Sequence, residues 1–358
     1  MHDSARGMRM TTPVVRPSRV TNGPNTHRSL TTHPKLQGSS KFVVYAALAG
    51  NLLVSATKFI AASVSGSASM MSEGVHSLVD TLNEVLLLYG MHRSKQTADR
   101  IHPLGYGREL YFWSFVVAML LFALGGGVSF YQGIVRIAAP QALENTQVIY
   151  IVLGLSAVFE GYSWWVSKQA FRTVKGRLSY WQAVRRSKDP PAFMVLLEDS
   201  AALVGIAIVA VATFAADRFS LPELDGIASL LIGLLLGATA SVIARECKAL
   251  LIGEQANPSV AASIKEITDG EPNVANVNDV VTFQLGPEHI VVALSLEFAD
   301  RLRTHDIERL VADIESKVCA RHPEVVTLFV KPQTPAAFAD GRRRRFKLGA
   351  HKPSVSEP

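Results

Sequence analysis

The segment ELDGIASLLIGLLLGATASVIARE at residues 223–246 decides the fold of this chain. Between Asp225 and Arg245 it contains no charged side chain, and it has no broad polar face. A helix of about 20 apolar residues spans the hydrocarbon core of a bilayer. The segment therefore predicts a transmembrane helix.

Further stretches of similar length and apolar character precede this segment, at residues 42–64, 72–91, 111–137, 146–168 and 191–216. The composition agrees, because 48% hydrophobic and only 18% charged residues are unusual for a soluble chain of 358 residues. A large soluble bundle would need six successive helices without broad polar faces. We therefore predict an all-α polytopic membrane bundle of six transmembrane helices over residues 41–248, with a bend at the Gly125–Gly127 run.

Lysine and arginine gather in alternate connections between these stretches. The N-terminal tail, the loop after residue 91, the loop before residue 191 and the tail after Arg245 are basic, whereas the other connections carry almost no net positive charge. The positive-inside rule then predicts that both termini are cytoplasmic. A bacterial inner or plasma membrane is favoured, and an organellar membrane is the alternative. The bases flank apolar stretches without a nucleic-acid motif, so the net charge of +6 does not predict nucleic-acid binding.

The regions outside the bundle are polar. Residues 1–40 predict a disordered basic tail, for which a transit peptide is the alternative. Residues 249–335 predict a small α+β domain with helices at 259–268 and 304–321 and strands at 277–284, 289–298 and 325–330. Residues 336–358 predict a second disordered basic tail, which either contacts anionic membrane lipid or is solvated.

Ionisable residues cluster on the second predicted helix, within SEGVHSLVDTLNEVLLLYG at residues 72–90. His76, Asp80 and Glu84 recur every four residues and form one stripe along a helix face. An ionisable side chain inside a membrane is costly unless it is paired, solvated or ligating. Imidazole with carboxylate suits zinc, iron, cobalt or manganese, whereas the structural alternative is a pair with a base such as Lys58.

The fifth predicted helix adds the neighbouring acids Glu198 and Asp199. Neighbouring side chains on a helix point about 100° apart, so one of the two faces the stripe and the other faces a neighbouring helix or cavity water. Asp80 and Asp199 each lie about 12–17 Å from the inner ends of their antiparallel helices. We therefore expect these two carboxylates to meet near the middle of the membrane.

Four motifs together resemble the cation diffusion facilitator family over about residues 40–335. They are SEGVHSLVD at 72–80, DRIHPLGYGRE at 99–109, DGIASLLIGLLLG at 225–237 and LLIGE at 250–254. The resemblance implies six helices, a ferredoxin- or metallochaperone-like cytoplasmic domain and a homodimer. It also implies export of zinc or a related divalent cation in exchange for protons.

Carried over residue by residue, the resemblance makes His76 and Asp80 metal ligands of the second helix and Asp199 a ligand of the fifth. The other fifth-helix position falls on Val195, which cannot bind metal. Glu84 is our first choice for the missing contact, because it continues the stripe at the depth of Val195. Asn83, Glu198 or water are the alternatives.

The tail domain also departs from the family pattern. Its last strand ends in FVKP, which places Phe329 and Lys331 where the family has ligands. His305 matches one remaining family position, and His289 lies near another such region. We expect this domain to dimerise rather than to bind metal.

These observations predict a homodimeric, proton-coupled efflux transporter for a divalent cation, with zinc first and manganese, iron or cobalt as other candidates. The metal is transported substrate, and neither a resident cofactor nor an enzyme activity is predicted. Metal binding to His76 and the carboxylates releases protons when the site is protonated beforehand. Val195 favours the alternative, a transport-impaired scaffold or regulatory subunit with the same fold. An intramembrane metalloprotease is disfavoured because HExxH is absent.

Overall fold

The computed structural model describes residues 37–350, except for the side chains of 37–50, 173–174 and 345–350. Residues 1–36 of the predicted tail at 1–40, and residues 351–358 of the predicted tail at 336–358, lie outside the described residues. The chain divides into two units, Met1–Tyr45 and Ala46–Pro358, and the helices and strands from Ala46 onward belong to the second unit.

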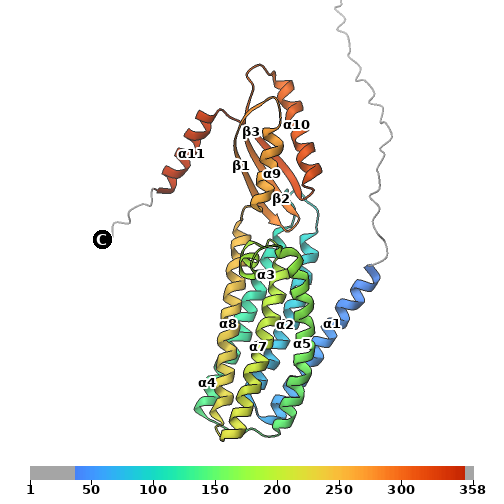
Figure 1. The fold of residues 1–358 in the computed structure, drawn as a ribbon, viewed down its shortest axis with the longest axis vertical. Helices are drawn as coiled ribbons and strands as arrows, with labels where there is room; N and C mark the ends of the chain where they lie inside the picture. Colours follow the sequence, from blue (N-terminus) through green and yellow to red (C-terminus); the bar gives the residue numbers. More distant parts are fainter. Residues whose placement is uncertain (1–36, 351–358) are drawn as a thin grey trace, which may run out of the picture. The chain divides into compact units, whose positions relative to one another are not determined.

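Long helices make up most of the second unit (Figure 1). α2 packs against α3, α7 and α8, and α5 packs against α7. Every predicted apolar stretch lies inside one of these helical runs. In chain order they are α1 (Gln37–Ser65), α2 (Ala68–Ser94), α3 (Arg108–Leu120), the π-helix η1 (Leu121–Val128), α4 (Ser129–Ala138), α5 (Thr146–Lys175), the short α6 (Tyr180–Arg186), α7 (Pro190–Phe219) and α8 (Glu223–Ile252).

Four helical stretches of the described chain are long and apolar enough to cross a membrane. They are the continuous run from α3 to α4, residues Thr146–Arg172 of α5, all of α7 and all of α8. α2 is not among them, because its polar stripe lowers its mean hydropathy. In α1, the apolar part at Asn51–Ser65 is shorter than these four stretches. The helical membrane class is therefore confirmed, and the spanning of α1 and α2 remains a prediction.

The run of three glycines at Gly125–Gly127 lies in a π-helical stretch, η1, instead of at an ordinary helix bend. A π-helix changes the phase of the side chains after it. Two of these glycines are buried, and Gly126 faces Gly237 of α8. The glycine run therefore belongs to the packing surface for α8.

Further glycines bring the backbones of α4 and α8 together. A Cβ atom at Gly133 would lie 2.6 Å from the Leu230 nitrogen, and one at Gly233 would lie 2.6 Å from the Phe130 nitrogen. Small residues at helix interfaces allow this approach inside a bilayer, where apolar side chains gain little by leaving lipid. The glycines of the DGIASLLIG motif thus define the seam between α8 and α4.

We expect Gly133→Leu to destabilise the protein by about 1–3 kcal/mol or more, because a side chain at this seam forces α4 and α8 apart. Thermal unfolding of the detergent-purified variant would measure the loss. Gly154→Leu is the matched control, since a Cβ at Gly154 of α5 meets no atom within 4 Å. Equal melting temperatures for the two variants would contradict the tight seam.

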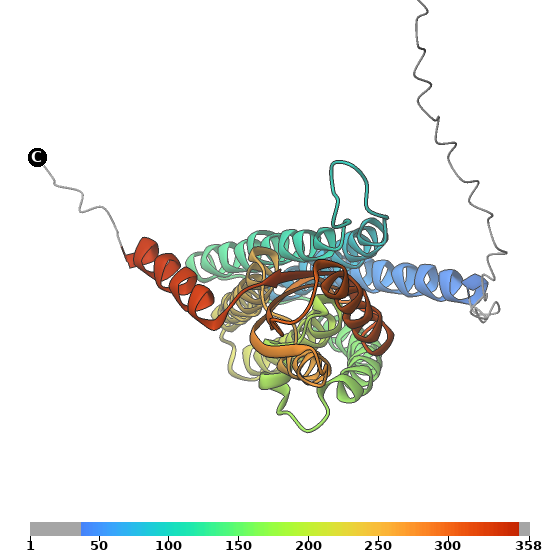
Figure 2. The ribbon, with the colours of Figure 1, turned by 90° about the horizontal axis from the view of Figure 1, so that it is seen from above.

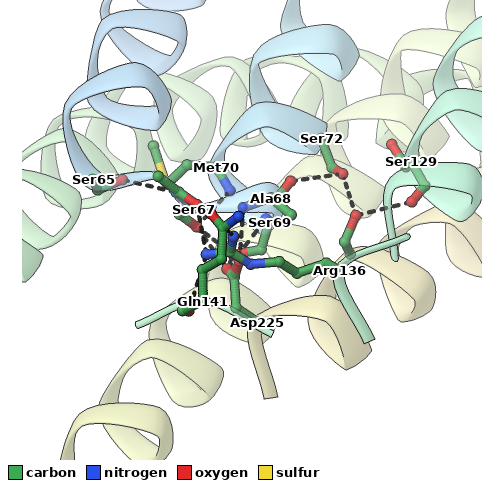
Figure 3. Close-up of polar contacts among 12 residues, drawn as sticks. Ser65, Ser67, Ala68, Ser69, Met70, Ser72, Ser129, Arg136, Gln141 and Asp225 are labelled. Carbon is green, nitrogen blue, oxygen red and sulfur yellow. Dashed lines mark hydrogen bonds and ion pairs between the residues drawn. The ribbon is translucent and has the colours of Figure 1, made fainter. Parts of the chain in front are cut away.

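A carboxylate closes the end of the bundle where α2 and α8 begin (Figure 3). Asp225 accepts hydrogen bonds from the hydroxyls of Ser67 and Ser69, both at 2.6 Å, and from the backbone nitrogens of Ala68 and Ser69 at 2.7 and 3.2 Å. The Arg136 Nε lies 3.4 Å from the same carboxylate. Free backbone N–H groups at a helix start favour a negative charge, so Asp225 fixes the start of α2 against α8.

A small α+β domain follows α8, and Gly253, the residue after the helix end, has a φ of 117°. Its elements are α9 (Pro258–Asp269), β1 (Val274–Gly286), β2 (His289–Phe298), α10 (Thr304–Arg321) and β3 (Val325–Pro332). β2 pairs antiparallel with β1 and parallel with β3. The side chains of Val292, Leu294, Ile314 and Val318 are almost fully buried between sheet and helices, and each contributes about 1.5–3 kcal/mol. The predicted α+β domain is therefore confirmed.

The chain beyond β3 differs from the prediction. A disordered tail was expected from residue 336, whereas the structure has a helix, α11 (Pro335–Ala350). Proline suits the first turn of a helix, and the alanines, arginines and lysine that follow are good helix formers. The disordered tail was predicted from the positive charge of the segment, without regard to its helix propensity.

The loop between α2 and α3 contains the DRIHPLGYGRE motif and reaches the β1–β2 hairpin. Seen from above, the α+β domain overlies the helices of the bundle (Figure 2). A Cβ at Gly107 would lie 2.8 Å from the Leu285 carbonyl oxygen, so the approach requires glycine. Within the loop, the His102 backbone N–H and the Tyr106 hydroxyl donate to Asp99 and hold the pKa of that carboxyl below its usual value. The motif therefore forms a folded connection to the α+β domain.

Candidate metal site

The predicted polar stripe lies on α2. His76 and Asp80 are one helical turn apart, and the His76 Nδ1 lies 3.4 Å from the Asp80 Oδ1. The His76 side chain is only 1% exposed, whereas that of Asp80 is 20% exposed. The stripe therefore runs from a buried imidazole to a partly accessible carboxylate.

Asp80 lines a cavity of about 40 Å³ between α1, α2, α5 and α7. Glu84 and Asp199 line the same cavity, and so does Val195. Helix packing thus brings three of the four predicted metal ligands to one space, with His76 beside Asp80. The full lining is Asn51, Val54, Ser77, Asp80, Glu84, Leu87, Phe159, Glu160, Ser163, Val195, Glu198 and Asp199.

Hydrogen bonds from neighbouring helices hold several of these carboxylates. Asp199 accepts from the hydroxyls of Ser163 and Ser167 of α5, at 3.0 and 2.9 Å. The Asn51 amide of α1 donates to Glu84 at 2.8 Å. These bonds fix the two side chains at the cavity wall.

Asn83 and Glu198, two alternatives for the missing ligand, contact each other. The Asn83 amide donates to the Glu198 carboxylate at 3.2 Å, and both side chains are buried. Glu198 was expected to face a neighbouring helix or cavity water. It contacts α2 and also lines the cavity beside Asp199, so both neighbouring acids of α7 reach the same space.

Lys58 of α1 was the base considered as a structural partner for the site carboxylates. Its ammonium instead lies 3.2 Å from Glu73 and 3.6 Å from Glu160, and it donates to the Ser77 hydroxyl at 2.7 Å. Among the described residues, neither Asp80 nor Asp199 forms an ion pair with lysine or arginine. The lysine therefore neutralises other acids and forms no ion pair with these two.

Sequence reasoning overlooked Glu73 and Glu160. Glu73 is fully buried beside Lys58, and Glu160 of α5 lines the cavity. Both acids lie inside predicted transmembrane stretches, where every ionisable residue is a candidate for a functional role. That signal was available, but neither acid belongs to the stripe of His76, Asp80 and Glu84 on α2.

The chemistry of the site fits a divalent transition metal. Neither ring nitrogen of His76 forms a hydrogen bond, and neither does the buried Asp80 Oδ1. Buried polar atoms are normally hydrogen-bonded, and imidazole nitrogen with carboxylate oxygen is a typical zinc ligand set. Within the part of the chain described, however, no three His, Cys, Asp or Glu side chains are arranged to hold a metal ion.

The four residues singled out in the α+β domain do not gather at one place. His289 begins β2 and His305 lies exposed in the first turn of α10. Phe329 and Lys331 lie on β3, and the Phe329 side chain is 56% exposed.

The apolar helices, the buried polar cavity and the appended α+β domain define a membrane protein of transporter type. Residues 44–252 match the family described as the cation efflux transmembrane domain. The chain belongs to this family, the cation diffusion facilitators, whose members are transporters rather than enzymes.

Curated relatives extend the similarity beyond the membrane bundle. The mitochondrial proton-coupled zinc antiporter SLC30A9 of Xenopus laevis is 32% identical over 310 residues, which are 84% of this chain and 55% of that protein. Metal tolerance protein C4 of Arabidopsis thaliana is 30% identical over 72% of this chain and 57% of its own length. The cation-efflux pump FieF of Serratia proteamaculans is 24% identical over 86% of this chain and 98% of its own length. The chain thus spans about half the length of the first two relatives.

Proposed function

We propose that this protein transports a divalent transition-metal cation out of a compartment in exchange for protons, with zinc as the first candidate. The observation that carries the proposal is the cavity that Asp80 and Asp199 line without a lysine or arginine partner among the described residues, next to His76, whose ring nitrogens form no hydrogen bond. Similarity to a protein named a proton-coupled zinc antiporter supports both the ion and the coupling. Manganese, iron and cobalt remain compatible with these ligands.

The proposed ligands are His76, Asp80 and Asp199, with Glu84 as a further contact. A dication that enters the cavity offsets the repulsion between the carboxylates and draws them inward. Imidazole and carboxylate bind metal only in their unprotonated forms, so a protonated site releases protons on binding. Alternating exposure of such a site to the two sides couples the two fluxes.

Zinc titration of the purified full-length chain tests the proposed binding site. Calorimetry in buffers of different ionisation enthalpy should show zinc binding accompanied by proton release. Binding without proton release would contradict the coupling, and absence of binding for zinc, manganese, iron and cobalt would contradict the transport function.

A second candidate function is a transport-impaired scaffold or regulatory subunit. Val195 favours it, because an apolar side chain occupies the cavity wall where a ligand is expected. A scaffold would keep the fold and the dimer without metal flux, so transport by the wild-type protein separates the two functions.

For the membrane setting, we propose that both termini are cytoplasmic, on the basis of the basic loops. A bacterial inner or plasma membrane is our first choice. The name of the mitochondrial relatives supports an organellar membrane as the alternative.

We further propose that the protein is a homodimer and that the α+β domain contributes to the contact. One face of its sheet is covered by α9 and α10, and the other carries the half-exposed Phe283 and Phe329. Phe283 pairs with Val291 on β2, whereas Phe329 pairs with Ala293, so the two rings lie on the same face. A second copy of this apolar face would cover both rings.

We expect Phe329→Glu to weaken dimerisation by at least about 10-fold, because two charges would face each other across a contact of apolar rings. The side chain is already more than half exposed, so the domain itself should fold. Light scattering of the detergent-purified protein over a range of concentrations would show the shift to monomer. An unchanged dimer would place the contact elsewhere in the chain.

A further inference from the structure

The apolar Val195 leaves one wall of the candidate metal cavity without the ligand that the family pattern would provide. The carboxylate of Glu160 enters the same cavity from α5. No α5 residue belongs to the proposed ligand set, which leaves the role of Glu160 open.

Glu160 lies on the face of α5 that is turned toward Asp199 of α7. Glu160, Ser163 and Ser167 are spaced by three and four residues, which places them on one helix face. Ser163 and Ser167 both donate to the Asp199 carboxylate. Glu160 therefore continues the face of α5 that contacts the metal-site carboxylate of α7.

The bonding of Glu160 differs from that of Glu84, Glu198 and Asp199, and resembles that of Asp80. Glu84, Glu198 and Asp199 each accept a hydrogen bond from a neighbouring helix. Among the side chains that the structure describes (residues 51–172 and 175–344), by contrast, none donates a hydrogen bond to the Glu160 carboxylate, which contacts the ammonium of Lys58 at 3.6 Å. Glu160, like Asp80, is thus held in the cavity by an ion pair and by no hydrogen bond of the described residues.

Lys58 can lose Glu160 without being left unpaired. Its ammonium keeps the Glu73 carboxylate at 3.2 Å and the Ser77 hydroxyl at 2.7 Å. A buried charge that lost all its partners would cost several kcal/mol, and these two contacts remove most of that cost. The ion pair with Glu160 is therefore suited to exchange.

We propose that Glu160 is a ligand for the transported divalent cation and replaces the contact that Val195 cannot make. In the absence of metal, Lys58 neutralises Glu160; when a dication enters the cavity, the Glu160 carboxylate turns from Lys58 to the metal. The unbonded ring nitrogens of the buried His76, beside Asp80, are an independent sign that this region accepts a ligand. The inference rests on the proposed transport function and adds a third helix to its ligand set.

Zinc affinity of Glu160→Gln, measured by calorimetry on the full-length protein, tests this role. Glutamine keeps the shape of the side chain but removes its charge, and we expect zinc affinity to fall by about 10- to 100-fold. Glu160→Gln could also lower zinc affinity indirectly, through its ion pair with Lys58. The double variant Lys58→Gln with Glu73→Gln tests this, because it has no lysine at position 58 for Glu160 to neutralise. Adding Glu160→Gln in that background should lower zinc affinity by the same factor.

Loss of affinity in both backgrounds supports Glu160 as a ligand. Loss in the wild-type background alone would show that Glu160 acts only as a partner of Lys58, and unchanged affinity in both would also overturn the inference. Val195→His provides a further check, since histidine at that position should restore zinc affinity to Glu160→Gln. If the wild-type protein binds none of the tested metals, the proposed function itself fails. That result differs from one in which the wild-type protein binds zinc and Glu160→Gln binds it with unchanged affinity.

Discussion

Asp80→Asn and Asp199→Asn are each expected to abolish zinc transport, with flux lowered by about 100-fold or more. Asparagine preserves the size of each side chain but removes an anionic ligand from a cavity wall where Val195 already provides none. Neither carboxylate balances a lysine or arginine in the described structure, so its removal leaves no buried lysine or arginine unpaired. Both variants should therefore fold, and zinc uptake by vesicles containing the purified variants measures the effect.

Asp217→Asn is the matched control for this pair. Asp217 is an exposed carboxylate near the end of α7, and the same chemical change there should leave zinc flux unchanged. Wild-type flux in either Asp80→Asn or Asp199→Asn would remove that residue from the ligand set. Loss of flux with loss of the folded protein would instead assign it a structural role.

Asp225→Asn is expected to destabilise the protein by about 3–5 kcal/mol, the usual cost of breaking a buried ion pair. The carboxylate is 1% exposed and accepts bonds from Ser67, Ala68 and Ser69. An amide would turn an N–H group toward some of these donors and would leave Arg136 without its anion. The melting temperature of the detergent-purified variant measures the loss.

Glu223→Gln is the control for Asp225→Asn. Glu223 lies in the same first turn of α8 but is exposed, so Glu223→Gln removes a charge near the same helix start without breaking a buried ion pair. A similarly small effect of both substitutions would show that Asp225 is not the fixed point between α2 and α8. His76 lies about 12 Å along α2 from Ala68, so we expect the Asp225 variant to lose zinc affinity as well.

Much of the fold could be predicted because bilayer helices depend on one local property, apolar length. The stretches 111–137, 191–216 and 223–246 all lie inside helices, and the helix predicted at 304–321 has those same bounds. Predicted ends fell short because helices continue past the apolar core, as α8 does to Ile252. The α11 helix was missed because its basic composition outweighed its helix propensity in the prediction.

The site was predictable where it depends on one helix. The spacing of His76 and Asp80 follows from the helical period, and the structure places them as expected. Which helices face one another depends instead on packing across the bundle. For this reason the sequence did not reveal that Lys58 pairs with Glu73 and Glu160, or that α5 contributes to the cavity.

Metal uptake by vesicles that contain the purified protein tests the central claim most directly. Zinc, manganese, iron and cobalt would be offered separately, with and without a pH gradient across the membrane. We predict uptake of at least one of these ions, with zinc first, that accelerates when protons can leave in the opposite direction and that moves the internal pH. Uptake that ignores the pH gradient would contradict proton exchange, and no uptake of any of the four ions by a folded protein would contradict transport itself.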